Sequence, residues 1–304
     1  MSAKVILLRV AQVLLVLFLF YYVASPLVRN AKAFSDTFLT LKPLCLCAGL
    51  LMLAFIISAY PFVWRYIVQG FGYELPLKTS IISWIYSNVG KYIPGKVWQF
   101  VGRVALTKKI KPEITLTTVF LEVIISSAAA IMVFFIRFFL RGNVSQLWLL
   151  YASLLFLVLL TLQHPSFIKF FLKLYARLRK VEMDLSRINL NLRRNLVVFV
   201  LYFVLWILTG VSFWVMIQGS SIRVSLLDSV TTYPISWILG YLTIIAPAGL
   251  GVRESILMTL LRGTYSGEVA SAFSILTRVA LVLGDFILFL FAFAFFEKGR
   301  LREK

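Results

Sequence analysis

The stretch ISWIYSNVGKYIPGKVWQFVGR, residues 82–103, is a broken apolar segment. Its apolar start is interrupted at Pro94 and Gly95, and Lys91 and Lys96 lie on either side of the interruption. Neither half is long enough to cross a bilayer, because a spanning helix needs ~20 residues. A broken segment with cations at its break predicts a re-entrant helical hairpin whose tip binds an anion.

The composition of the whole chain places this hairpin in a membrane protein. Of the 304 residues 61% are hydrophobic and 14% are charged, which is too apolar for a soluble domain of this length. Long apolar runs recur without extended alternation of apolar and polar residues, which favours helices over a transmembrane barrel. The net charge of +19 comes mostly from short connections and tails. It therefore indicates cytoplasmic loops beside an anionic leaflet rather than binding to nucleic acid.

The apolar runs predict an all-α polytopic fold with about six transmembrane helices in a single domain, residues 1–304. Between the fourth and fifth spans, residues 164–194 are strongly basic, with apolar residues at three- and four-residue spacing. This segment is either an amphipathic helix on the cytoplasmic face or an ordinary basic loop that sets the topology. The expected spans cover about residues 4–24, 44–68, 114–136, 147–162, 195–217 and 267–296.

A second interrupted stretch, ISWILGYLTIIAPAGLGVRE at residues 235–254, resembles the first. The two ISWI motifs and the two breaking prolines, Pro94 and Pro247, share an offset of 153 residues (235 − 82 and 247 − 94). If the basic segments are cytoplasmic, the two hairpins enter the membrane from opposite sides, as in the inverted repeats of many secondary transporters. We predict one repeat at 44–136 with a hairpin at about 77–104, and another at 195–296 with a hairpin at about 230–263.

The break in each repeat has the chemistry of an anion site. A half-helix that begins near the proline leaves backbone N–H groups unpaired, and its dipole favours negative charge. Gly249 and Gly251 would let the backbone approach a head group closely. Arg253 would bind phosphate in a bidentate way, with Glu254 beside it as a partner. The candidate substrate-binding residues are Asn88, Lys91, Tyr92, Pro94, Gly95, Lys96, Gln99, Arg103, Pro247, Gly249, Gly251, Arg253 and Glu254.

Three ionisable residues lie deep in expected spans, where an unpaired charge is costly. Arg278 and Asp285 are seven residues apart on the last span (285 − 278), and Glu122 lies near the position that the repeat makes equivalent to Arg278. We expect Arg278 to pair with Glu122 or Asp285. This pair either holds the spans together or releases its cation to bind a lipid phosphate.

At NVGKYIPGKVWQ, residues 88–99, and PAGLGVRE, residues 247–254, the chain resembles the flippase-like, or lysylphosphatidylglycerol synthase transmembrane, family. Ala248 stands where this family usually has a glycine. The resemblance extends over nearly the whole chain, and it implies movement of anionic or polyprenyl-phosphate-linked lipids between leaflets. No soluble aminoacyl-transferase domain follows the last span, so we expect no synthesis of an aminoacyl lipid.

Together these features predict a lipid flippase rather than an enzyme, with an anionic lipid or a lipid-linked saccharide as its substrate. We expect a multi-pass protein of the cytoplasmic membrane of a prokaryote, with both termini in the cytoplasm and with no cofactor, metal or nucleic acid. One alternative is a membrane-embedded transferase acting on a lipid carrier, for which Asp36 and Asp228 are the candidate extracellular general bases. Another is an accessory subunit that holds a glycosyltransferase or lipid-modifying enzyme through residues 164–194.

Overall fold

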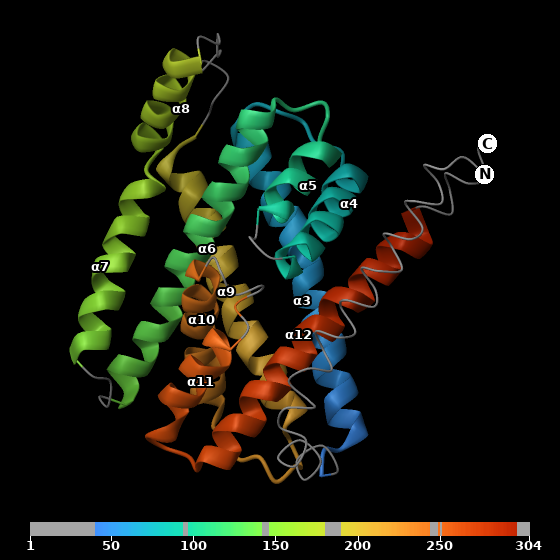
Figure 1. Ribbon diagram of the computed structural model, residues 1–304, viewed down its shortest axis with the longest axis vertical. Coiled ribbons are helices and arrows are strands. Elements are labelled where there is room, and N and C mark those ends of the chain that lie inside the picture. Colours follow the sequence, from blue (N-terminus) through green and yellow to red (C-terminus); the bar gives the residue numbers. More distant parts are fainter. Residues whose placement is uncertain are drawn as a thin grey trace.

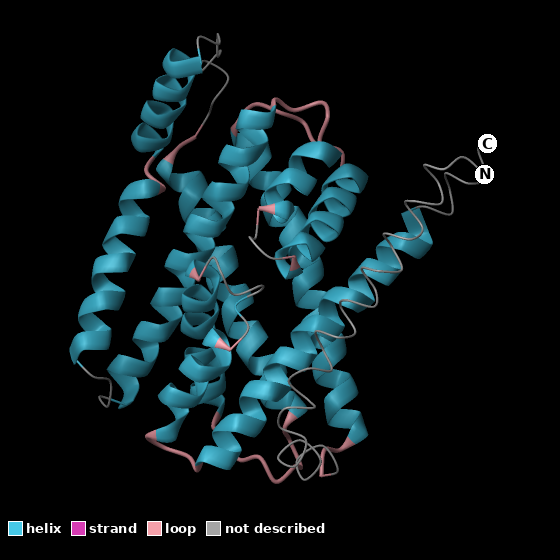
Figure 2. Cartoon of the chain, in the orientation of Figure 1, coloured by secondary structure: helices cyan, strands magenta, loops and turns pink. Residues whose placement is uncertain are grey.

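The computed structural model describes residues 40–93, 97–141, 146–179, 190–243, 249 and 251–296. Every regular element within these ranges is a helix, which confirms the predicted all-α class (Figure 2). The helices are α3 (Pro43–Gly70), α4 (Leu77–Asn88), η1 (Val89–Tyr92), α5 (Trp98–Leu106), α6 (Pro112–Arg141), α7 (Gln146–Leu162), α8 (Pro165–Arg179), α9 (Leu192–Met216), α10 (Leu226–Leu242), α11 (Val252–Arg262) and α12 (Gly267–Phe296).

Four of these helices, α3, α6, α9 and α12, are long and apolar enough to cross a membrane. The 30 residues of α12 correspond to a length of ~45 Å at 1.5 Å per residue. The fourth expected span, at about 147–162, coincides with α7, whose 17 residues are short for a full crossing and which bends by 65° into α8. The described residues therefore contain four candidate spans, or five if this bent pair counts as one, and the expected span at 4–24 lies outside the described residues.

The same order of long and short helices occurs twice. A long helix, two short helices and a second long helix follow one another as α3 to α6 and again as α9 to α12. The first long helices begin 149 residues apart (192 − 43), and the last begin 155 apart (267 − 112). The short helices α4 and α5 pack against each other, as do α10 and α11. We call α4 to α5 the first hairpin and α10 to α11 the second hairpin.

The two hairpins lie towards opposite ends of the molecule. In Figure 1 the first hairpin lies in the upper half, towards the end that carries α8, and the second hairpin lies in the lower half. Each hairpin packs on a long helix of the other half, α4 on α12 and α10 on α6. The centre is formed by α3 and α9, which pack against each other. The halves are therefore interlocked rather than arranged as two separate bundles.

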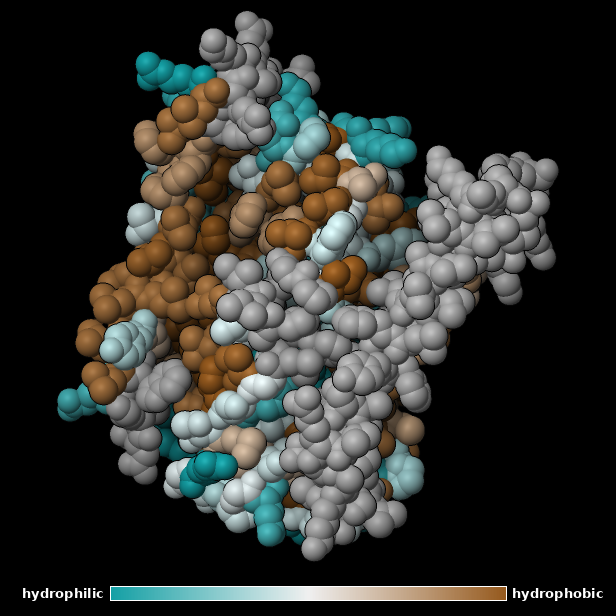
Figure 3. Space-filling model, viewed as in Figure 1, coloured by the Kyte–Doolittle hydropathy of each residue, from teal (hydrophilic) through white to brown (hydrophobic). Residues whose placement is uncertain are grey.

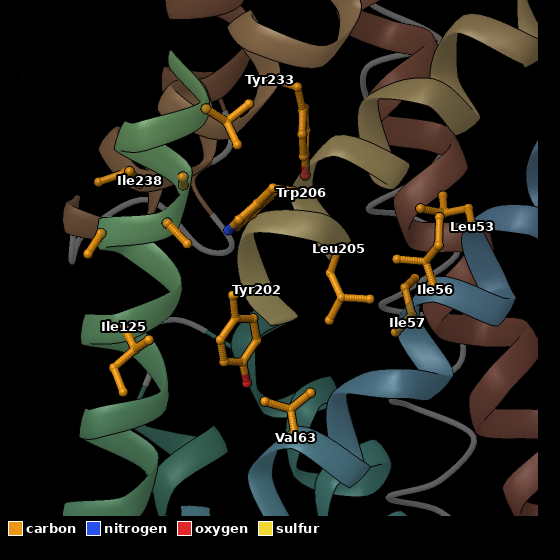
Figure 4. Close-up of a cluster of buried hydrophobic side chains, with 14 of the residues drawn as sticks. Leu53, Ile56, Ile57, Val63, Ile125, Tyr202, Leu205, Trp206, Tyr233 and Ile238 are labelled. Carbon is orange, nitrogen blue, oxygen red and sulfur yellow. The ribbon is translucent and has the colours of Figure 1, made fainter. Parts of the chain in front are cut away.

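The apolar core surrounds α9. Figure 4 shows Tyr202 and Leu205 of this helix between side chains of α3, such as Ile57, and of α6, such as Ile125. All four side chains belong to one cluster of buried hydrophobic residues. On the face seen in Figure 3, hydrophobic side chains cover a broad area over α7, while hydrophilic side chains gather towards the two ends. This surface fits a multi-pass membrane protein, because lipid chains contact the apolar middle and water contacts the ends.

Candidate functional site

A cavity of about 100 Å³ lies where the two hairpins meet. Both hairpins and α12 contribute polar side chains to its wall, so residues far apart in the sequence share one space. A larger cavity of about 380 Å³ lies between α6 and the α7–α8 bend, but its lining is almost entirely apolar. The smaller cavity is the candidate site because it alone of these two combines cations with hydrogen-bond donors. Its polar lining residues include Asn88, Lys91, Gln99, Tyr241, Arg253 and Asp285.

One hydrogen bond joins the hairpins directly across this cavity. The Gln99 side-chain amide on α5 donates to the Tyr241 hydroxyl on α10, with 2.5 Å between Nε2 and Oη. The Tyr241 ring in turn stacks on Trp237, with 5.1 Å between ring centroids. Gln99 thus lies in the site as the sequence predicts, and its partner is a residue that the sequence analysis did not single out.

The tip of the first hairpin holds a carboxylate of α12. Asn88 Nδ2 donates to Asp285 Oδ1 at 2.9 Å, and Tyr92 Oη donates to Asp285 Oδ2 at 2.6 Å. Lys91 Nζ forms an ion pair with the same Oδ2 at 2.6 Å. The three donors are spaced i, i+3 and i+4, so they project from one face of the helical turn that ends α4 and continues in η1. Three predicted site residues therefore converge on Asp285.

Arg253 enters the cavity from the second hairpin. Its guanidinium lies 5.6 Å from the centroid of the Trp237 ring, which is a cation–π geometry. The residue is 9% exposed, and its Nε has no hydrogen-bond partner within the described residues. A buried donor without a partner is costly, which makes this nitrogen available to an acceptor on a ligand.

Two glycines make room for the Arg253 side chain. A Cβ on Gly240 would lie 2.2 Å from Arg253 Cγ, and a Cβ on Gly249 would lie 2.9 Å from Arg253 Nε. The Gly249 backbone, at φ +73°, is also close to the Gly240 carbonyl. Gly249 therefore packs inside the protein rather than presenting open backbone, whereas the space around a Cβ on Gly251 is empty. The predicted close approach to a ligand fits Gly251 better than Gly249.

The predicted pairing of Arg278 with Glu122 or Asp285 is wrong. Its Nε lies 3.7 Å from Glu254 Oε1 on α11, while Asp285 and Glu122 are held by other cations. Glu254 therefore pairs with Arg278 of α12. From the sequence we expected it to pair with its neighbour Arg253. The pair is loose, because neither Glu254 oxygen has a hydrogen-bond partner among the described residues.

Arg103 and Glu122 form a buried pair away from the cavity. Arg103 Nη1 lies 3.3 Å from Glu122 Oε2, and Arg103 Nε donates to Ser87 Oγ at 2.8 Å. Glu122 also accepts hydrogen bonds from Trp84 Nε1 at 2.8 Å and from the Tyr202 hydroxyl at 3.1 Å. Arg103 is 4% exposed and does not line the cavity. Its contacts join α5 to Ser87 of α4 and to Glu122 of α6, so it positions the first hairpin.

Asp228, a candidate general base for a transferase, is fully buried at the start of α10. Its carboxylate forms ion pairs with Arg137 and with Arg141, the latter at 2.7 Å, and accepts a hydrogen bond from the Tyr265 hydroxyl at 2.5 Å. Ser225 caps the same helix end by accepting from the Asp228 backbone N–H at 3.1 Å. A fully buried carboxylate that is paired with two arginines fits a structural role at this helix start better than that of a general base. Asp36 lies outside the described residues.

Several predicted site residues, Pro94, Gly95, Lys96 and Pro247, also lie outside the described residues. Within the described residues, α5 begins at Trp98 and α11 at Val252, four and five residues after the prolines (98 − 94 and 252 − 247). Neither helix start has a side-chain cap in the structure. The prediction that each half-helix begins close to its proline concerns residues outside the described ranges and stays a prediction.

The aromatic residues of the site escaped the sequence analysis. Trp84 holds Glu122, Trp237 lies beside Arg253, and Trp206 contacts Trp237 with 5.1 Å between ring centroids. In an apolar run such residues look like ordinary core or interface positions. One signal was present, since Trp84 and Trp237 occupy the same place in the two ISWI motifs, 153 residues apart (237 − 84).

Comparison with known proteins places the chain in a family. The search of curated proteins returned no match to this chain. The family described as the lysylphosphatidylglycerol synthase TM region matches residues 5–288, which include both hairpins and every described residue of the cavity wall. With a match over nearly all of its length, the chain belongs to the family of the lysylphosphatidylglycerol synthase transmembrane region.

Proposed function

We propose that this protein is a flippase that moves an anionic phospholipid, or a polyprenyl-phosphate-linked lipid, between the two leaflets. The head-group phosphate enters the cavity between the hairpins, while the lipid chains stay in the surrounding bilayer. Lys91 and Arg253 supply the positive charge on the two sides of the cavity, with Lys96 as a further candidate cation at the first break. This function agrees with the family assignment, because the family is a membrane region associated with lipids.

The observation that carries this proposal is the shared cavity. Lys91 belongs to the first hairpin and Arg253 to the second, yet both line the same space of about 100 Å³. Arg253 Nε lacks a hydrogen-bond partner among the described residues. A guanidinium binds phosphate oxygens well, because its N–H groups match their geometry. A buried cation with no ion pair among the described residues supports an anionic ligand at this position.

The arrangement of the hairpins supports movement across the membrane. The hairpins lie towards opposite ends of the molecule and meet at the cavity (Figure 1). We infer that both are re-entrant and that the two halves form an inverted repeat. If each hairpin moves in turn, the cavity opens first to one leaflet and then to the other, which is the alternating-access scheme of inverted-repeat transporters.

Reconstitution in liposomes tests this function. The purified protein is placed in vesicles with a panel of fluorescent lipids that includes phosphatidylglycerol and a polyprenyl phosphate, and the rate of exchange between leaflets is measured. We expect wild type to accelerate exchange of at least one phosphate-bearing lipid, and Lys91→Ala and Arg253→Ala to reduce the rate about tenfold or more, in line with loss of a charge-assisted contact.

Matched controls separate the loss of a cation from the cavity from the loss of a positive charge elsewhere in the protein. Arg262→Ala removes an exposed arginine from the same helix as Arg253, and Lys111→Ala removes an exposed lysine from a loop. Both controls are expected to keep the wild-type rate. If exchange of every phosphate-bearing lipid in the panel equals that of protein-free vesicles, the flippase proposal is wrong.

A further inference from the structure

The anion-binding face of the first hairpin is already occupied in this structure. Asn88, Lys91 and Tyr92 all direct their donors at Asp285, at distances of 2.6 to 2.9 Å. An ion pair and two hydrogen bonds to one carboxylate group is the arrangement expected of a bound anionic ligand. A carboxylate and a phosphodiester present the same kind of partner, a single negative charge spread over two oxygens. Asp285 therefore occupies the position of an anionic ligand.

We propose that Asp285 is an internal competitor for the head-group phosphate, so that a phosphate binds Asn88, Lys91 and Tyr92 only by displacing this carboxylate. The inference rests on the proposed function and adds how its site is controlled. It explains why Lys91, the cation of the first hairpin that lines the cavity, is paired with a carboxylate while the cavity is only about 100 Å³ in volume. That volume corresponds to about three water molecules and leaves no room for a large head group while Asp285 holds its place.

The exchange is asymmetric in burial, which favours release of the carboxylate towards the second hairpin. The Lys91 side chain is 23% exposed and the Asp285 side chain is 6% exposed. Arg253 lines the same cavity wall as Asp285 and has an unused Nε. After displacement Asp285 either pairs with Arg253 or takes a proton from solvent, because an unpaired carboxylate is unstable in this apolar setting. The groups that face this region are Tyr60 of α3, Tyr233 of α10, Arg253 of α11 and Arg278 of α12.

Carboxyl labelling of the wild-type protein tests the displacement without any mutation. The protein in phosphatidylcholine vesicles is treated with a membrane-permeant carbodiimide, with and without added phosphatidylglycerol, and labelling of each carboxyl is measured by mass spectrometry. We expect phosphatidylglycerol to increase labelling of Asp285 several-fold. Glu122 is the internal control, because its pair with Arg103 lies outside the cavity and its labelling should stay constant. Equal labelling of Asp285 in both vesicles overturns the proposal.

A variant supplies the second measurement. Asp285→Asn keeps the shape of the side chain and removes the competing charge, so we expect it to bind short-chain phosphatidylglycerol about tenfold more tightly than wild type, as for removal of one competing ion pair. Short-chain diacylglycerol, which lacks phosphate, should bind both proteins equally. Binding of phosphatidylglycerol to Asp285→Asn that is equal to or weaker than binding to wild type overturns the proposal.

The two proposals fail in different ways. If wild type exchanges phosphatidylglycerol between leaflets but labelling of Asp285 does not respond to this lipid, the flippase function stands and the competition is wrong. If labelling responds but exchange does not exceed that of protein-free vesicles, the site binds the phosphate as inferred and the transport function is wrong.

Discussion

Arg103 on α5 and Glu122 on α6 form a buried ion pair, 3.3 Å between Nη1 and Oε2, and the second half of the chain repeats this relationship with the charges exchanged. There Glu254 on α11 faces Arg278 on α12, with 3.7 Å between the paired atoms. In both halves the second hairpin helix is thus joined to the long helix that follows it. The tighter pair, in the first half, is surrounded by further hydrogen bonds, whereas the looser one borders the cavity region around Arg253.

The pair of Arg103 and Glu122 gives a prediction about stability. Glu122→Gln leaves the Arg103 guanidinium buried without its counter-charge, which typically costs ~3–5 kcal/mol. We expect a large drop in the midpoint of thermal unfolding in detergent. The control is Glu74→Gln, at an exposed position outside the helices, which should leave the midpoint unchanged. A Glu122→Gln variant as stable as wild type would contradict a structural role for this pair.

Asp228, in the first turn of α10, gives a second prediction, which separates its ion pairs from its role at the helix start. Asp228→Asn removes the ion pairs with Arg137 and Arg141 while keeping a residue type that is compatible with a helix start. We expect it to destabilise the protein by ~3–5 kcal/mol, because the buried Arg137 loses its counter-charge. Thermal unfolding measures the loss, and the exposed-site variant Glu268→Gln is the control. If Asp228→Asn is instead stable and binds lipid but loses activity, a transferase with Asp228 as its base becomes the better interpretation.

Gly240 gives a prediction about transport. The methyl group of Gly240→Ala would lie 2.2 Å from Arg253 Cγ, so the arginine side chain must leave its present position. We expect transport in liposomes to fall about tenfold, with a stability cost of ~1–3 kcal/mol from overpacking. Gly263→Ala is the control, because a Cβ at Gly263 meets no atom within 4 Å. Equal transport by both variants would show that the position of Arg253 does not matter.

The hydrogen bond between the hairpins gives a fourth prediction. In a double-mutant cycle with Gln99→Leu and Tyr241→Phe, we expect a coupling energy of ~0.5–1.5 kcal/mol in thermal unfolding, because the two side chains are in direct contact. Each single variant should also change the rate of lipid exchange. The pair Gln69→Leu and Tyr241→Phe is the control cycle, since Gln69 lies in the last turn of α3 and does not line the cavity. A coupling energy near zero for Gln99 and Tyr241 would mean that the two hairpins move independently.

The helices were largely predictable from the sequence, because long apolar runs leave few alternatives in a bilayer. The expected runs at 44–68, 114–136, 195–217 and 267–296 lie within α3, α6, α9 or α12 to within one residue. The ends of the helices were harder to predict. α6 continues to Arg141, beyond the expected span at 114–136, and so includes Arg137 and Arg141. Side chains at a helix end can reach a neighbouring element, and hydropathy does not reveal that reach.

Part of the lining of the candidate site was predictable from the sequence, but the ion pairs of its residues were not. Asn88, Lys91, Gln99 and Arg253 line one cavity, as expected from the broken segments. Which carboxylate each cation finds depends on how the long helices are rotated about their axes. Composition and spacing constrain that rotation weakly, so Lys91 was not matched with Asp285, nor Arg278 with Glu254. The repeated tryptophans of the ISWI motifs were the strongest signal left unused.

The interlocked halves have a consequence for how the protein is made. α4 packs on α12, and Lys91 meets Asp285, which the ribosome adds 194 residues later (285 − 91). If the first hairpin is re-entrant as proposed, it would enter the membrane before then with a lysine that lacks the Asp285 counter-ion, at a cost of ~2.5–3.5 kcal/mol on insertion scales. A nascent chain that stops before α12 should therefore leave this hairpin accessible to insertion chaperones and quality-control proteases. Assembly is completed from the C-terminal end, when the last helix supplies the missing charge.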